Sequence, residues 1–519
     1  MKLHLNDTFN KELTADTDTS NTRRQVFGAC YSFVTPRVPS NPQLLHVTTE
    51  VADLIGLSKD DLTSKEFLEV VSGSKILPET QPFAMAYAGH QFGNWAGQLG
   101  DGRAINLFEV INNKKRWALQ LKGAGETPYS RNADGLAVLR SSIREHLCSE
   151  AMFHLGVPTT RSLSLVTTGD KVLRDILYNG NPAYEDGAVV CRVAPSFIRF
   201  GNFELLAARK DLPNLKALAD YTIHHFYPQI KETGKEKYLA FYQEVVNRTV
   251  DMIVEWQRVG FVHGVMNTDN MSILGLTIDY GPYGWLEDYN PDWTPNTTDA
   301  EGKRYRFRNQ PDIALWNLIQ LGNALYPLIE DIPAMETILN SYSHHFDAKF
   351  PLMMQEKLGL TSVYDSDFQD ELTTLLTAYE TDMTIFYRNL ANVLKSDSPE
   401  IALSKIEYAF YQSDAIVTTI KTSWFNWMEA YLKKLNEDSI SDTDRKVRMN
   451  KVNPKYVLRN YMAQLAIDAA EKEDYTLINE FHELLKHPYD EQPQNEKWFA
   501  KRPDWARNKV GCSMLSCSS

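Results

Sequence analysis

Short apolar runs in the first half of the chain predict β-strands. The clearest cover residues 104–111 and 117–121, and the polar residues 112–115 between them favour a hairpin turn. Two further strand-like runs cover residues 162–167 and 187–193. This part of the chain is therefore expected to be largely β-structure.

Helical periodicity dominates elsewhere. One short helix is expected over residues 54–67, and a longer one over residues 136–155, where leucine and isoleucine recur at helical spacing. A helical region with internal breaks covers residues 205–260, and the pattern of residues 313–485 is almost entirely helical. Strands, one helix, more strands and then many helices indicate an α+β fold, unlike the regular alternation of a Rossmann fold.

The same pattern divides the chain into four regions. Residues 1–80 are expected to form an N-terminal extension, and residues 81–204 a smaller lobe that holds the strands. Residues 205–400 would form a larger helical lobe, and residues 401–519 a helical C-terminal extension with a flexible, cysteine-containing tail.

Composition allows a large core, or two lobes that share a cleft, since 43% of the 519 residues are hydrophobic. The 54 basic and 67 acidic residues give a formal net charge of -13, without an obvious basic tract. Duplex nucleic acid and anionic membranes are therefore poor candidates for partners. No signal-peptide core, presequence or bilayer-spanning apolar run is recognisable, so a cytoplasmic enzyme of bacterial type is expected.

Cysteine usage does not indicate a disulfide framework or a zinc site, because the five cysteines are scattered and form no C-x-x-C pair. Cys30, Cys148 and Cys191 are expected to be reduced and mostly buried. Cys512 and Cys517 lie in the short C-terminal tail, where an exposed thiol can meet oxidants or a second thiol.

A glycine-rich turn precedes the first clear strand and reads Gly97-Gln-Leu-Gly100-Asp-Gly102-Arg103. Glycines let the backbone approach phosphates closely, and the N–H groups can donate to anionic oxygens. Arg103 adds a fork of donors that matches phosphate. Alone, such a turn is more often a structural hairpin than a nucleotide site.

Lys122 ends the strand at residues 117–121, and Glu145 lies on the following helix, off its apolar stripe. In protein kinases, a strand Lys paired with a helix Glu is oriented onto the ATP phosphates. For an arbitrary Lys and Glu, two surface charges that never meet would be the commoner outcome. The pair gains weight from the motif that follows it.

Asp269 and Asn270 end a polar loop after the long helix, and Asp279-Tyr-Gly follows nine residues beyond Asn270. Mg²⁺ prefers one or two carboxylate or amide oxygens together with substrate phosphates, and Asp-Tyr-Gly resembles the metal-binding Asp-Phe-Gly of kinases. Adjacent Asp and Asn depart from the kinase catalytic loop, in which the metal-binding Asn lies further downstream. Alone, two ordinary turns would explain these residues; in the kinase order, they indicate a metal and nucleotide site. His263, in the same loop, is expected to pack the loop rather than to act as a ligand or base.

Five longer motifs carry a resemblance to a known family: Gln98-Leu-Gly-Asp-Gly-Arg103, Gln120-Leu-Lys-Gly-Ala-Gly-Glu-Thr-Pro-Tyr-Ser-Arg131, Ser141-Ser-Ile-Arg-Glu145, His263-Gly-Val-Met-Asn-Thr-Asp-Asn-Met-Ser272 and Asp279-Tyr-Gly-Pro-Tyr-Gly-Trp285. With these motifs, the chain resembles the selenoprotein O family, also called YdiU, from about residue 83 to the C-terminus. The resemblance implies a bilobal, protein-kinase-like (pseudokinase) fold, with lobes at residues 81–204 and 205–400.

The resemblance also implies a reaction. ATP would bind in a flipped orientation, and AMP would pass to Ser, Thr or Tyr hydroxyls of proteins, including the enzyme itself, while pyrophosphate leaves. UMP transfer from UTP with Mn²⁺ is also attributed to the family. A conventional kinase and an ATP-binding scaffold are the alternatives; the Asp-Asn adjacency argues against the first, and the complete set of metal and phosphate residues against the second.

Roles for single residues follow from the resemblance. Asp269 would be the general base, Asn270 and Asp279 would bind Mg²⁺ or Mn²⁺, and Glu145 would brace Lys122. The ATP contacts would be Gly100, Gly102, Arg103, Lys122, Asp134, Gly135, Arg192, Arg199 and Asp279.

Cys517 stands where some family members carry selenocysteine. In certain bacterial members this residue forms a disulfide with a cysteine in the loop after Asp-Tyr-Gly, but residues 287–312 contain no cysteine here. A bridge to Cys512 or a mixed disulfide is the alternative.

Overall fold

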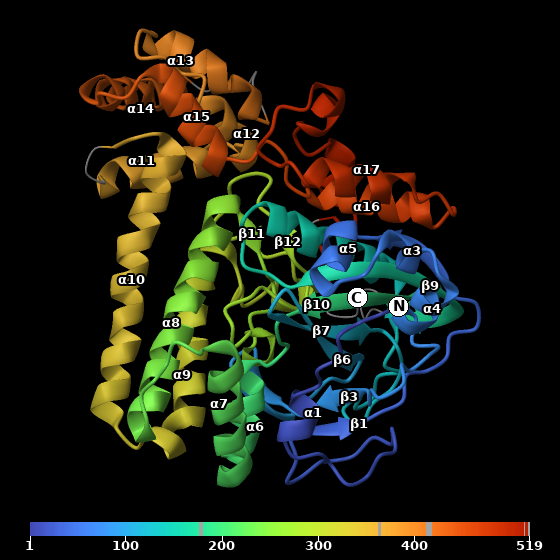
Figure 1. Ribbon diagram of the computed structural model, residues 1–519. Coiled ribbons are helices and arrows are strands. Elements are labelled where there is room, and N and C mark those ends of the chain that lie inside the picture. The colour runs from blue at the N-terminus through green and yellow to red at the C-terminus, as the bar shows by residue number, and fades with distance from the viewer. Residues whose placement is uncertain (176–179, 362–364, 412–417, 513, 517–519) are drawn as a thin grey trace.

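The computed structural model describes residues 1–175, 180–361, 365–411, 418–512 and 514–516. An antiparallel sheet built mainly from the first 200 residues lies beside a set of long helices, and a helical C-terminal part extends over both (Figure 1). The mixed architecture of strands followed by many helices agrees with the expected α+β order. Cys517 lies outside the described residues.

Among the described residues the sheet has eight strands in the order β1-β3-β6-β7-β10-β9-β2, with β8 paired to β10, and each of these pairings is antiparallel. Both edge strands come from the first 80 residues, so this segment completes the sheet. The strands are β1 (Tyr31–Phe33), β2 (Gln43–Val47), β3 (Phe83–Met85), β6 (Ala104–Asn112), β7 (Lys115–Lys122), β8 (Ala137–Val138), β9 (Arg161–Arg174) and β10 (Ala183–Ala194).

The expected hairpin joins β6 and β7. Asn113 and Lys114 form its two-residue turn, with φ of 49° and 61°. Positive φ at both positions matches the right-handed twist of the two strands. At the other end of β7, Lys122 pairs with Ala104 of β6. Lys122 therefore lies at the end of the sheet, beside the glycine-rich turn of residues 97–103.

Helices cover both faces of the sheet. α5 (Leu139–His154) packs on one face, where Ile143 shares a core with Val190. On the other face Val189 shares a core with Val51 of α2.

The single helix expected over residues 54–67 is wrong, because Gly56 with φ of 84° ends the first helix and serine side chains cap the next two. The three helices are α2 (Thr49–Ile55), α3 (Lys59–Leu62) and α4 (Lys65–Val71).

The larger helical part begins directly after β10. α8, α9 and α10 lie side by side in Figure 1 and pack against one another. The helices are α6 (Phe200–Ala208), α7 (Leu212–Phe226), α8 (Gly234–Val259), α9 (Gln310–Ile329) and α10 (Ile332–Leu358). Between α8 and α9, the strands β11 (Phe261–Val262) and β12 (Gly284–Trp285) pair and bring the two ends of a long loop together. That loop contains the 3₁₀ turn η1 (Thr268–Asn270).

The C-terminal part has two groups of helices. One group lies beyond the end of α10 and comprises α11 (Ser366–Ala378), α12 (Met383–Leu390), α13 (Pro399–Ile406), α14 (Thr418–Glu437) and α15 (Asp442–Val452). The other, α16 (Asn460–Ala470) and α17 (Thr476–Leu485), returns to pack on α5. In the described ranges, no helix combines the length and the apolar character that crossing a bilayer requires.

The expectation of an exposed Cys512 in a flexible tail is wrong. Cys512 is fully buried, and burial raises the pKa of its thiol to about 11. Leu515, also buried, donates its N–H to Pro295 O at 2.9 Å and accepts from Thr297 N at 2.7 Å. The described part of the tail is therefore fixed to the loop that follows Asp279-Tyr-Gly, through the two backbone hydrogen bonds of Leu515 and the burial of the Cys512 and Leu515 side chains.

Candidate functional site

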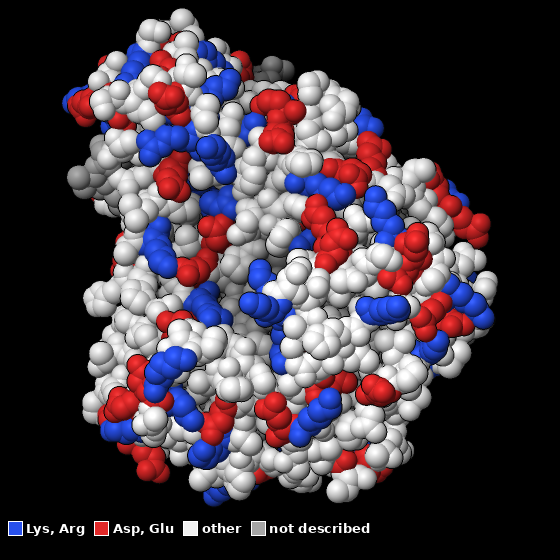
Figure 2. Space-filling model, in the orientation of Figure 1, with Lys and Arg blue, Asp and Glu red and all other residues white. Residues whose placement is uncertain are grey.

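A cavity of about 890 Å³ lies between the sheet and the loop that holds η1. Figure 2 shows a recess near the middle of the visible face, with Lys and Arg side chains gathered around it. Its size suits a nucleotide. It is lined by Gly100, Gly102, Arg103, Lys122, Asp134, Gly135, Arg192, Arg199, Asp269, Asn270 and Asp279. The structure thus brings together every predicted site residue except Glu145, which lies behind Lys122, and Cys517, which is not described.

Lys122 stands at the end of β7 and forms an ion pair with Glu145 of α5, as the sequence led us to expect. Both side chains are buried, and a buried charge is tolerated only when a partner compensates it. Burial lowers the pKa of Lys122, and the charge of Glu145 opposes that effect. The pair therefore fixes a cation at the floor of the cavity.

Two arginines bind the carboxylate of Asp279, one at each oxygen. Arg192 Nη1 donates to Oδ1 of Asp279 at 2.6 Å, and Arg199 Nη1 donates to Oδ2 at 2.5 Å. Burial raises the pKa of Asp279, but the charges of Arg199, Arg192 and Lys122 outweigh it and hold that pKa well below its usual range. Asp279 is thus a carboxylate, in a left-handed backbone conformation with φ of 57°.

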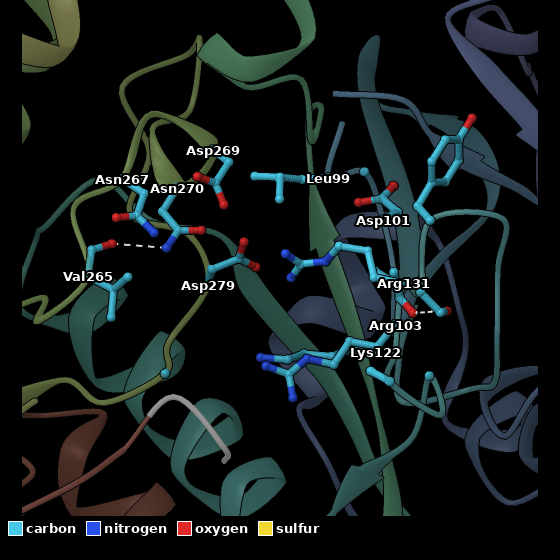
Figure 3. A pocket seen from close by; sticks show the side chains of 18 of the residues that line it. Leu99, Asp101, Arg103, Lys122, Arg131, Val265, Asn267, Asp269, Asn270 and Asp279 are labelled. Atoms are coloured by element: carbon cyan, nitrogen blue, oxygen red, sulfur yellow. Dashed lines mark hydrogen bonds between the residues drawn. The ribbon is translucent and has the colours of Figure 1, made fainter. Parts of the chain in front are cut away.

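Asp269 and Asn270 lie on the same wall as Asp279, opposite Arg103, Arg131 and Lys122 (Figure 3). Asn270 Nδ2 donates to Val265 O at 2.9 Å, which leaves its Oδ1 available to the cavity.

Asp269 differs from Asp279 in its surroundings. Burial raises its pKa to about 7, although a hydrogen bond from Gln91 and the charge of Arg199 oppose the rise. Its Oδ2 accepts from Gln91 Nε2, whereas Oδ1 is buried and has no hydrogen-bond partner among the described residues. Asp269 still lines the cavity, so part of its side chain faces the space that a ligand would occupy.

The oxygens of Asn270 and Asp279 fit a divalent cation of the Mg²⁺ or Mn²⁺ type. Such an ion takes few protein ligands and completes its coordination with phosphate oxygens and water. Carboxylate oxygens have more than one lone pair, so Asp279 can accept from the two arginines and still bind a metal. The described residues hold no group of three or more His, Cys, Asp or Glu side chains placed for a metal ion, and a site that relies on phosphate does not need one.

The glycines of the cavity are required where they lie. A Cβ on Gly100 would come within 2.4 Å of the Tyr129 ring, and one on Gly135 within 2.2 Å of Gly125 O. Both have positive φ, which glycine adopts without cost. They allow the backbone to line the cavity at close range.

Both carboxylate oxygens of Asp134 are engaged by Arg174. Arg174 Nη1 donates to its Oδ2 at 2.7 Å and Nη2 to its Oδ1 at 2.8 Å, and Nη2 also donates to Leu136 O at 3.0 Å. Arg174 itself lines the cavity. The pair fixes the loop that includes Gly135.

Sequence reasoning did not single out several cavity residues, among them Gln91, Arg131 and Arg174. Arg131 ends the motif that begins at Gln120, and Gln91 follows Gly-His in a glycine-rich stretch, so the sequence around both gave a weak indication of a functional site. Arg174 ends a strand and had none. His263 is buried and donates through Nε2 to Ile278 O at 2.8 Å, which is the packing role expected for it.

Known proteins resemble this chain along nearly its whole length. The family model described as "Protein adenylyltransferase SelO" matches residues 17–486. A "Protein nucleotidyltransferase YdiU" of Flavobacterium johnsoniae is 63% identical over 519 residues, which cover 100% of this chain and 99% of the relative. Proteins of the same name from Rhodopirellula baltica and Aromatoleum aromaticum are 54% and 53% identical, each with 100% of this chain and 99% of the relative covered.

Proposed function

Because this chain belongs to the protein adenylyltransferase SelO family, we propose that it transfers AMP from ATP to Ser, Thr or Tyr hydroxyls of proteins, itself included. We further propose a kinase-like arrangement, in which the sheet with α5 is the smaller lobe and the helices from α6 onward belong to the larger one. The observation that carries the proposal is the cavity in which a buried Lys–Glu pair faces Asp269, Asn270 and Asp279.

The cations of the cavity are suited to a triphosphate. Phosphoryl chemistry needs little covalent assistance from the protein and much neutralisation of charge. Lys122, Arg103, Arg192 and Arg199 would supply positive charge, and the glycine turn would supply backbone N–H groups. When bound at Asn270 and Asp279, Mg²⁺ or Mn²⁺ would neutralise further phosphate charge and orient the phosphates.

Asp269 is proposed as the proton acceptor. The acceptor hydroxyl attacks the α-phosphorus, the bond from that phosphorus to the bridging oxygen of pyrophosphate breaks, and the hydroxyl proton moves to Asp269. The carboxylate of Asp269 is suited to receive it because the residue lines the cavity. This requires the α-phosphate to face the acceptor, which is the flipped orientation that the family resemblance implies.

Labelled nucleotides test the proposal. The protein is incubated with an acceptor protein and with ATP labelled at the α- or the γ-phosphate, with Mg²⁺ or Mn²⁺ present, and covalent label is measured after denaturation. Covalent α-label is expected. Covalent γ-label would instead indicate a conventional kinase, and label in neither case an ATP-binding scaffold. A parallel reaction with α-labelled UTP and Mn²⁺ measures the preference between AMP and UMP transfer.

A further inference from the structure

A β-hairpin outside the main sheet reaches across to the loop that holds Asp269. Its strands, β4 (Ala88–Gln91) and β5 (Asn94–Gln98), pair with each other as a separate two-stranded sheet. The hairpin lies between β3 and β6 in the sequence, yet it packs on η1 and α6. It is therefore a direct connection from the sheet to the proposed proton acceptor.

Three successive residues of the hairpin each bind one residue of this loop. The bonds are His90 N to Thr268 Oγ1 at 2.7 Å, Gln91 Nε2 to Asp269 Oδ2 at 3.1 Å, and Phe92 N to Asn267 Oδ1 at 3.2 Å. Two of the donors are backbone N–H groups that any residue except proline would supply. Only the bond to Asp269 depends on the side chain of the hairpin residue.

The hairpin backbone also passes very close to Asp269. A Cβ on Gly89 would lie 2.5 Å from Oδ1 of Asp269 and 2.9 Å from its Cβ. A side chain at this position would therefore displace the carboxylate. Between the close backbone at Gly89 and the amide of Gln91, the carboxylate has little freedom to rotate.

We propose that Gln91 is a positioning residue for the transfer reaction: its amide N–H holds Oδ2 of Asp269 and so fixes the orientation of the carboxylate that takes the proton of the acceptor hydroxyl. This inference rests on the proposed function, since it takes Asp269 as the proton acceptor. An amide suits the task because it donates a hydrogen bond without carrying charge and does not compete for the proton. Supporting hydrogen bonds of this kind fix the orientation of a reactive side chain.

Removing the amide should leave the hairpin in place, because other contacts anchor it. Two residues of α6 make these contacts: Glu204 Oε2 lies 2.5 Å from His90 Nδ1, and Asn202 Nδ2 donates to Ala86 O at 2.9 Å just before the hairpin. Gln91→Met keeps the length of the side chain and removes its donor. The variant therefore tests the hydrogen bond rather than the fold of the hairpin.

The first experiment compares steady-state AMP transfer by Gln91→Met and the unaltered protein. We expect kcat to fall roughly 10- to 100-fold, while KM for ATP stays within about twofold because the nucleotide contacts are intact. Asn94→Ala is the matched control, since Asn94 is an exposed amide of the same hairpin that donates to Phe92 O at 3.3 Å. An unchanged kcat in Gln91→Met, or a change in KM for ATP alone, would overturn the proposal.

A double-mutant cycle separates positioning from general support of the fold. If Gln91 acts through Asp269, then Asp269→Asn combined with Gln91→Met should be no slower than Asp269→Asn alone. Multiplying losses would overturn the positioning role. Full activity of Asp269→Asn would overturn the proposed proton acceptor, whereas full activity of Gln91→Met beside an inactive Asp269→Asn would overturn only the inference about Gln91.

Discussion

Arg192 links Asp279 to the ion pair at the floor of the cavity. Its Nη1 donates to Oδ1 of Asp279 at 2.6 Å and to Oε1 of Glu145 at 3.1 Å, and Glu145 is the partner of Lys122. The proposed metal ligand and the proposed phosphate-binding Lys thus belong to one buried network. In such a network, removal of one charge changes the balance at all the others.

Asp279→Asn should abolish AMP transfer. The amide still suits the left-handed backbone at this position, where φ is 57°, but it lacks the charge that attracts a divalent metal. We expect a loss of at least roughly 100-fold at saturating Mg²⁺ or Mn²⁺, measured with α-labelled ATP. Asp292→Asn, in a surface ion pair with Arg306 and Arg308, is the control. Normal transfer by Asp279→Asn would contradict the metal assignment.

Local patterns in the sequence were sufficient to predict the core of the sheet, and the hairpin of β6 and β7 was predicted because strands and turn are adjacent in the chain. The Lys122–Glu145 pair was predicted only from the kinase-like order of the motifs and from the family resemblance. The edge strands β1 and β2 were not predicted. Their partners lie far away in the sequence, and three- to five-residue strands carry little periodicity.

Contacts between distant segments account for most of what the sequence did not reveal. Gln91 contacts Asp269 across 178 positions, and Arg174, at the end of β9, reaches Asp134 in the loop before β8. Leu515, three residues after the buried Cys512, pairs with Asn296. None of these contacts has a local pattern, because each depends on how separate elements pack.

Lys122→Ala should weaken the use of ATP strongly. The substitution removes a buried cation from the cavity and leaves Glu145 facing it with Arg192 as its remaining charged partner among the described ion pairs. We expect kcat/KM for ATP to fall roughly 100-fold or more, measured by AMP transfer over a range of ATP concentrations. Lys115→Ala, at the exposed start of the same strand, is the matched control and should be normal. A near-normal rate for Lys122→Ala would contradict its role at the phosphates.

Arg174→Ala should affect nucleotide binding more than chemistry. The guanidinium binds Asp134 through two hydrogen bonds and also binds Leu136 O, so its loss should loosen the loop around Gly135. We expect KM for ATP to rise roughly 5- to 20-fold with kcat changed little, the pattern of lost ground-state binding. Arg174→Lys should restore only part of the affinity, because an ammonium cannot form the paired contact. An unchanged KM in Arg174→Ala would contradict the role of this pair.

A cluster of three histidines, the half-buried His46 and the buried His146 and His482, joins β2, α5 and α17. His46 Nδ1 lies 2.8 Å from His146 Nε2, and the rings of His46 and His482 are 4.3 Å apart between centroids. Burial lowers the pKa of His46 to about 4 and that of His482 to about 2, and the nearby Lys486 adds to both effects. Burial also holds the pKa of His146 well below its usual range. The folded protein therefore keeps these histidines neutral.

The cluster should make the protein less stable in acid. Histidine in the unfolded chain titrates near 6.5, so between pH 6.5 and about 4 the unfolded state binds more protons than the folded state. The free energy of unfolding should therefore fall as the pH drops through this window, by up to about 1.4 kcal/mol per pH unit for each histidine, and these groups should have no effect above it. Urea unfolding at pH 7.5, 6.5, 5.5 and 4.5 measures the slope. His146→Gln should reduce the contribution of the cluster by about a third, whereas His344→Gln, an exposed histidine of α10, should leave the slope unchanged. Equal slopes for His146→Gln and the unaltered protein would show that the cluster does not control acid stability.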